Sequence, residues 1–147
     1  MISDAVEACV AATSDPYRLR DTLAGLYPVS LTGAELALAG GEPTSGATQA
    51  GRVRADALAA YERREQELGP SVLREIERKL MPAVIDREWR EHLSELDRLR
   101  EHAGVQGSGC ADPLEDYQRS AAELYGGFLR RVRHQAVRSL YFLQIPL

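Results

Sequence analysis

The sequence of 147 residues has the length of one domain, and its 44% apolar and 27% charged residues are typical of globular rather than disordered chains. Its formal net charge of −4 gives no general attraction to nucleic acid. Cys9 and Cys110 form no spacing motif, which indicates a reducing compartment. The first residues lack the basic segment of a signal peptide, and no apolar run reaches the roughly 20 residues of a membrane-spanning helix.

Short helices are predicted over the first part of the chain. Residues 2–12 carry apolar side chains at helical spacing. Asp15 is a candidate N-cap for a second helix, which ends before Pro28. Thr32 and Glu35 have the spacing of a capping box and predict a third short helix.

Longer helices follow a linker rich in Gly, Ser, Thr and Pro at 40–51. A helix is predicted over 52–68, and the longest helical pattern extends over 71–102. Pro82 interrupts this pattern and removes one backbone hydrogen bond, so a kink is expected near 78–82.

The last helical pattern follows a glycine-rich loop, "AGVQGSGCA", at 103–111. It begins at "DPLE", where Asp112 can cap and Pro113 suits the first turn. Two long amphipathic helices joined by a short loop fold back antiparallel. The sequence therefore predicts an all-α fold, with a long antiparallel two-helix hairpin and a small helical wing-like subdomain.

The seam of this hairpin is predicted from apolar residues spaced mostly three or four apart. Trp89 is expected in the seam, against the returning helix, while the charged residues around it in "DREWRE" cover the solvated faces. The alternative is an aromatic side chain that binds a partner. The predicted seam residues are Ile85, Trp89, Leu93, Leu96, Tyr117, Leu124 and Phe128.

Motifs for catalysis and for cofactors are missing from the sequence. His92 and His102 lie among carboxylates, but Trp89 occupies the position three before His92 where a carboxylate-bundle metal site needs Glu. We therefore expect no metal and a solvated His92. The segment "GVQGSG" has no following lysine, and Ser108 and Cys110 have no evident base. The prediction is a protein without catalysis or cofactor.

Four segments in order resemble the SecA preprotein translocase family, which drives secretory proteins across a membrane. They are "LYPVSLT" (26–32), "AYERREQELGPSVLREIERK" (60–79), "VIDREWREHLSELDRLRE" (84–101) and "DPLEDYQR" (112–119). The resemblance is to the helical wing and the two-helix finger of the helical scaffold. It implies the end of a scaffold helix at 1–14, a wing-like subdomain at 15–69 and a finger-like hairpin at 70–147.

In that family the tip loop of the finger enters the channel mouth and contacts the translocating polypeptide. The resemblance therefore makes the tip residues Val105, Gln106, Ser108 and Cys110 candidates for partner binding. Ser108 falls where the family has a tyrosine, and Gln106 falls where it has an arginine. An aromatic ring that could pack on a polypeptide is thus absent from this position.

The motor domains of the family are not part of this sequence, so the resemblance implies no ATPase here. We expect a non-catalytic, protein-binding module related to preprotein translocation, with a translocase component or a preprotein as partner. It would be cytoplasmic or peripheral at the inner face of the plasma membrane, without nucleic acid. The alternatives are a structural protein that forms homo-oligomers, or a segment of a complete SecA-type translocase ATPase.

Overall fold

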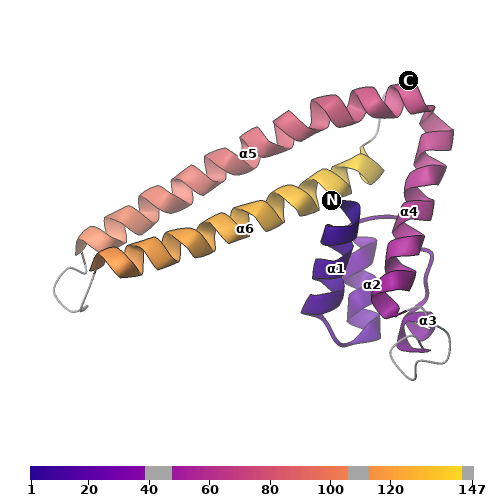
Figure 1. The fold of residues 1–147 in the computed structure, drawn as a ribbon, viewed down its shortest axis with the longest axis horizontal. Helices are drawn as coiled ribbons and strands as arrows, with labels where there is room; N and C mark the ends of the chain where they lie inside the picture. The colour runs from indigo at the N-terminus through magenta and orange to yellow at the C-terminus, as the bar shows by residue number, and fades with distance from the viewer. Residues whose placement is uncertain (39–47, 106–112, 144–147) are drawn as a thin grey trace. The chain divides into compact units, whose positions relative to one another are not determined.

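The computed structural model describes residues 1–38, 48–105 and 113–143. Over these ranges the chain forms six α-helices and no strand, which confirms the predicted all-α class (Figure 1). The helices are α1 (Ile2–Ala12), α2 (Pro16–Ala24), α3 (Gly33–Leu38), α4 (Gln49–Leu68), α5 (Pro70–Val105) and α6 (Pro113–Phe142).

Contacts divide the chain into two compact units. We call Met1–Leu80 with Arg133–Leu147 the wing unit, and Met81–Val132 the hairpin unit. The domain boundary expected from the sequence follows the junction between α4 and α5. The compact units instead divide α5 and α6 within their lengths, and α5 continues as helix through Pro82.

The short helices begin where the capping side chains predicted them. Asp15 accepts a hydrogen bond of 2.9 Å from the backbone N–H of Tyr17 at the start of α2. Before α3, the backbone N–H of Thr32 donates to Glu35 at 2.7 Å, and the N–H of Glu35 donates back to the Thr32 hydroxyl at 3.3 Å. The hydrogen bonds from Thr32 lower the pKa of Glu35.

Helix α4 begins earlier than predicted. The Thr48 hydroxyl accepts a hydrogen bond of 3.2 Å from the N–H of Gly51, so the helix starts inside the expected linker. Its end agrees with the sequence, because Gly69 adopts a φ of 81° that other residues rarely take. The part of the linker at 39–47 lies outside the described residues.

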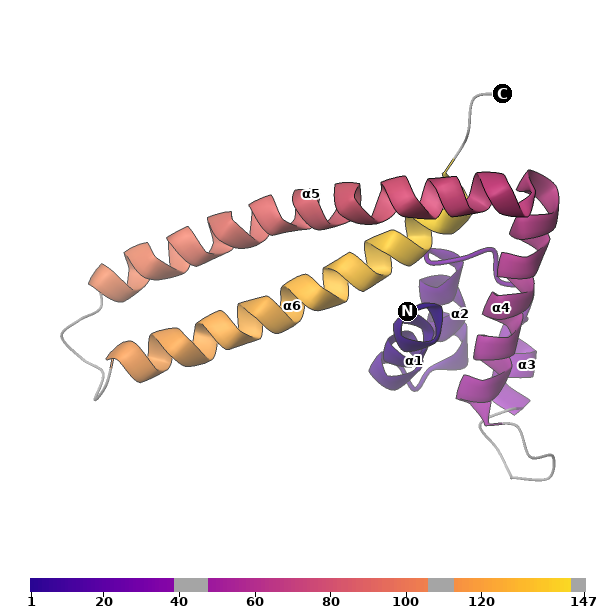
Figure 2. The ribbon, with the colours of Figure 1, turned by 45° about the horizontal axis from the view of Figure 1, so that its top comes forward.

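The wing unit has its own apolar core, in which α1 packs against α2 and α4, and α2 packs against α3 (Figure 2). Tyr27 is fully buried in this core, and its ring lies 5.9 Å from that of Tyr141 between centroids. The other core residues are Ala5, Val6, Cys9, Leu19, Leu23, Leu26, Leu36, Val53, Ala57, Ala60 and Val137.

Two buried tyrosines use their hydroxyls to tie the wing unit together. Tyr27 donates to the Asp56 carboxylate at 2.9 Å, and the backbone N–H of Ser30 donates to the same carboxylate at 3.1 Å. Tyr141 donates to the carbonyl of Ala57 at 2.7 Å. Burial first, and then the Asp56 charge, raises the pKa of Tyr27, and burial likewise raises that of Tyr141.

Because of these tyrosines, the stability of the protein is expected to fall at alkaline pH. The folded state holds the Tyr27 proton while the unfolded chain releases it above about pH 10, so stability is full below that pH and falls as pH rises. When the pH rises from about 10 to 11, the free energy of unfolding of the parent should fall. We expect that of Tyr27→Phe to fall by about 1 kcal/mol less. Urea unfolding at both pH values measures this. Tyr17→Phe, at a 67% exposed residue, is the control, and an unchanged alkaline loss in Tyr27→Phe contradicts the assignment.

Candidate functional site

The hairpin unit is formed by two helical segments that run side by side in opposite directions. Residues 81–105 of α5 lie against residues 113–132 of α6 in both views (Figures 1 and 2). Their contacts comprise an aromatic cluster and, beside it, a group of charged side chains.

The aromatic cluster is centred on Phe128, which is only 6% exposed. Its ring stacks on His92 with 5.2 Å between centroids, and Trp89 meets it edge-on at 5.5 Å. The Tyr125 ring lies 5.9 Å away. Stacked and edge-to-face arrangements at these separations are favourable beyond the area that they bury. The cluster therefore joins α5 to α6 near the middle of the unit.

The burial pattern on α5 corrects the predicted seam. Ile85, Trp89 and Leu93 are 43%, 43% and 44% exposed, so they do not form the buried stripe of α5, although the Trp89 ring meets Phe128 on the returning helix. Glu88 and His92 are 8% and 3% exposed, and they lie in the seam instead of on the solvated faces. One residue in a helix corresponds to about 100° of rotation, so the buried stripe is turned by about a quarter of a revolution from the predicted one.

Other predicted seam residues lie closer to their expected places. Phe128 is buried, while Leu96, Tyr117 and Leu124 are partly buried. Val84, which is 4% exposed, begins the stripe that continues through Glu88 and His92. The apolar pattern thus finds the inner face of α6 better than that of α5.

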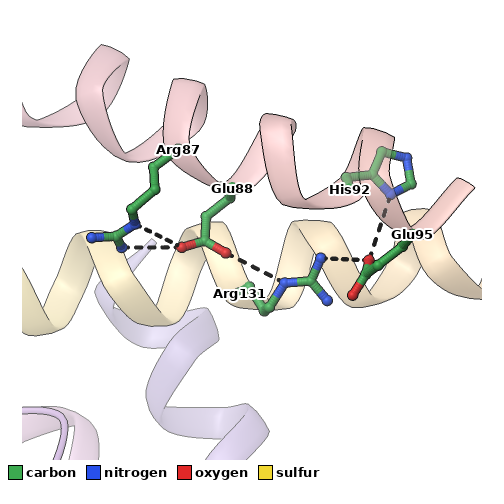
Figure 3. Close-up of polar contacts among 5 residues, drawn as sticks. All are labelled: Arg87, Glu88, His92, Glu95 and Arg131. Carbon is green, nitrogen blue, oxygen red and sulfur yellow. Dashed lines mark hydrogen bonds and ion pairs between the residues drawn. The ribbon is translucent and has the colours of Figure 1, made fainter. Parts of the chain in front are cut away.

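The charged group explains how a carboxylate can stand in the seam. Arg131 on α6 reaches two carboxylates on α5 at once (Figure 3). Its Nε lies 3.3 Å from Glu88 Oε2, an ion pair, and its Nη2 donates to Glu95 Oε2 at 2.8 Å. Arg87 Nη2 donates to the other Glu88 oxygen at 3.0 Å. Hydrogen bonding to Glu95 raises the pKa of Arg131.

This ion bridge fixes the register of the two helices. Glu88 and Glu95 are seven residues apart, which is close to two helical turns, so they project from nearly the same side of α5. Arg131 lies between them, and sliding α6 along α5 by one turn would move it away from one carboxylate (Figure 3). This arrangement was not predicted from the sequence, in which the seven-residue spacing of Glu88 and Glu95 is the available signal.

His92 has no hydrogen bond to its Nδ1 atom among the described residues, although the side chain is buried. The nearest carboxylate oxygen, of Glu95, lies 4.0 Å away, which is too far for a hydrogen bond (Figure 3). The expectation of a solvated histidine was therefore wrong. Over the described ranges, no group of three His, Cys, Asp or Glu residues could hold a metal ion.

Substituting Trp89 should have a smaller effect than full burial would give. We expect Trp89→Ala to lower the free energy of unfolding by about 1–2 kcal/mol, since the side chain is half exposed and full burial corresponds to about 3–5 kcal/mol. Chemical denaturation measures this. Arg90→Ala, on the exposed side of the same helix, is the matched control and should remain within about 0.5 kcal/mol of the parent. A loss above about 3 kcal/mol contradicts the half-exposed position.

The predicted partner-binding residues of the tip mostly lie outside the described residues. Helix α5 ends at Val105, whose side chain is not described, and Gln106, Ser108 and Cys110 fall within the undescribed segment 106–112. In the part of the chain that the structure describes, no helix is long and apolar enough to cross a membrane.

Fold and site together define an all-α module with a helical hairpin held by an ion bridge and an aromatic cluster. A family model described as the SecA wing and scaffold domain matches residues 1–144. The chain belongs to this family. The match is to the wing and scaffold region and not to ATPase motor domains.

Similar proteins bear the name protein translocase subunit SecA. The one from Kineococcus radiotolerans is 40% identical over 129 residues, covering 86% of this chain and 14% of the relative. That from Beutenbergia cavernae is 36% identical, with 98% and 15% covered, and that from Rhodococcus jostii is 38% identical, with 99% and 17% covered. The chain therefore spans about one sixth or less of the length of these relatives.

Proposed function

We propose that the chain is a non-catalytic SecA-type wing and scaffold module that binds other proteins in preprotein translocation. The observation that carries the proposal is the family match, which extends over residues 1–144, together with relatives named protein translocase subunit SecA. Its partner would be a translocase component or a preprotein. The module would act in the cytoplasm or peripherally at the inner face of the plasma membrane.

The hairpin unit supports this role physically. A partner-binding loop is effective when the elements that carry it hold their register, because a loosely held loop loses more entropy on binding. The Arg131 bridge and the Phe128 cluster hold the two helices together, and the tip segment between Val105 and Pro113 joins them. Val105, Gln106, Ser108 and Cys110 are the proposed contact residues of this loop.

Site-directed crosslinking from the tip tests the proposal. The native thiol of Cys110 can carry a photo-reactive group, whereas Cys9 is buried and burial raises its pKa, so it reacts poorly. We expect an unfolded secretory precursor or a translocation-channel protein to be crosslinked to the tip. Ser108→Tyr should strengthen the crosslink to the precursor, because a ring adds packing area that a hydroxyl lacks.

The matched control moves the photo-reactive group away from the tip. In Cys110→Ser with Glu91→Cys, the label lies on an exposed position of α5 and should give only background crosslinking. Equal crosslinking from both positions, or background from the tip with and without Ser108→Tyr, contradicts a partner-binding tip.

The second reading is a segment of a complete SecA-type translocase ATPase, which the small share of each relative that the chain covers favours. In either case this chain itself should not bind ATP, since its sequence has no GxxxxGK[ST] phosphate-binding motif. Calorimetry with Mg-ATP is expected to show no saturable heat. Binding with a Kd below about 100 μM contradicts the non-catalytic reading.

A further inference from the structure

One titratable side chain inside the hairpin unit takes no part in the ion bridge. His92 is only 3% exposed, and its ring lies 5.2–6.0 Å from those of Phe128, Trp89 and Tyr125 between centroids. Its Nδ1 atom has no hydrogen-bond partner among the described residues. Buried polar atoms in proteins are nearly always paired, so this unpaired atom needs a physical reason.

The charged and titratable groups that face this ring come from both helices. On α5, Glu88 and Glu95 lie four residues before and three residues after His92, which places them on the same side of the helix. On α6, Arg131 pairs with both carboxylates, and Tyr125 is the other titratable neighbour. The carboxylate oxygen nearest to the unpaired Nδ1 is Glu95 Oε2, at 4.0 Å (Figure 3). A proton on Nδ1 therefore has a carboxylate within reach.

We propose that His92 and Glu95 form a proton-binding site that is coupled to the Arg131 bridge. When the imidazole takes up a proton from the solvent, both ring nitrogens become donors, and Nδ1–H gains an acceptor in Glu95. The distance has to shorten by about 1 Å, to the roughly 2.7–2.9 Å of a charged hydrogen bond. The Glu95 side chain is long and 22% exposed, so rotation about its own bonds can supply that movement. The proposal concerns contacts within the hairpin unit and does not depend on the proposed function.

The protonated imidazole and Arg131 compete for the same carboxylate. Arg131 Nη2 donates to Glu95 Oε2 at 2.8 Å, and His92 Nδ1 faces that same oxygen. Glu88 offers no substitute, because Arg87 and Arg131 hold its two oxygens. Two cations that share one carboxylate repel each other, so protonation of His92 weakens the hold of Arg131 on α5. The bridge that fixes the helix register is thereby sensitive to acid between about pH 5 and 8, where histidines titrate.

Titration of the His92 ring by nuclear magnetic resonance tests the site. The ring is identified by its proximity to Phe128, and its chemical shifts are followed from about pH 5 to 8. Glu95→Gln removes the negative charge and keeps the shape, so the titration midpoint should fall by at least about 0.5 pH units. Arg131→Met removes the competing cation, so the midpoint should rise by at least about 0.5 pH units. By reciprocity, that rise measures how much the proton weakens the bridge.

Two neighbouring substitutions serve as matched controls. Glu91→Gln and Arg130→Met remove the same kinds of charge from exposed positions of α5 and α6, where solvent and salt screen them. Each should move the His92 midpoint by less than about 0.3 pH units. The comparison uses variants whose far-ultraviolet circular dichroism matches that of the parent.

The Glu95 carboxyl carbon gives a second readout that needs no substitution. Its chemical shift in the parent should change in a step at the His92 midpoint, because the new hydrogen bond forms there. A His92 midpoint that moves no further in Glu95→Gln or Arg131→Met than in the controls overturns the proposal. So does a midpoint that moves in the opposite direction, or a Glu95 carboxyl carbon that shows no step.

Discussion

Phe128→Ala is expected to lower the free energy of unfolding by about 3–5 kcal/mol, among the largest effects of any single substitution in the hairpin unit. Phe128 is 6% exposed, and its ring contacts His92, Trp89 and Tyr125. Removing the ring leaves a cavity between the two helices and uncovers the buried imidazole of His92. Chemical denaturation followed by circular dichroism measures the loss.

The other phenylalanine of the chain provides a matched control. Phe142 is 46% exposed at the end of α6, so Phe142→Ala removes the same atoms with little loss of burial. Its expected cost is below about 1.5 kcal/mol. Similar losses for the two variants would contradict the central place of Phe128 in the hairpin contacts.

Arg131→Ala is expected to cost about 2–3 kcal/mol, because it leaves Glu88 buried with Arg87 as its remaining ion-pair partner. The expected value is below the largest known for buried ion pairs, since the Arg131 side chain is itself 35% exposed. Arg130→Ala, at the exposed neighbouring residue, should cost less than about 0.5 kcal/mol. Denaturant midpoints of the three proteins give the comparison.

A double substitution separates the ion pair from simple loss of packing. Combining Arg131→Met with Glu88→Met removes both charges and keeps apolar volume in the seam, so it should recover most of the stability lost in Arg131→Ala. A double variant that is less stable than Arg131→Ala would show that the charges are not the reason for the loss.

Capping residues in the sequence were sufficient to predict where α2 and α3 begin. Asp15 and the Thr32–Glu35 pair act over two or three residues, so the printed sequence contains both partners of each hydrogen bond. The start of α4 was missed because Thr48 stands in a segment whose composition resembles a linker. The composition of that segment disfavours a helix, but the capping hydrogen bond to Thr48 stabilises the first turn and determines where the helix starts.

The inner face of α5 could not be predicted for a different physical reason. Two lines of residues along α5, offset from each other by one position, could each face α6. The more apolar line, with Ile85, Trp89 and Leu93, is the exposed one. Glu88 is tolerated in the other line only because Arg131 reaches it from α6. Residues so far apart in the sequence give no local signal of their pairing, and an apolar pattern counts Glu88 as surface.

The central claim, that this chain is a SecA-type module that binds translocation partners, is tested most directly by competition. The purified chain is added in excess to membrane vesicles in which a complete SecA relative translocates a secretory precursor. A module that occupies the same partners should reduce translocation as its concentration rises, and the Phe128→Ala chain, with its weakened hairpin, should inhibit less. Undiminished translocation at a large excess of the folded parent chain would contradict the claim.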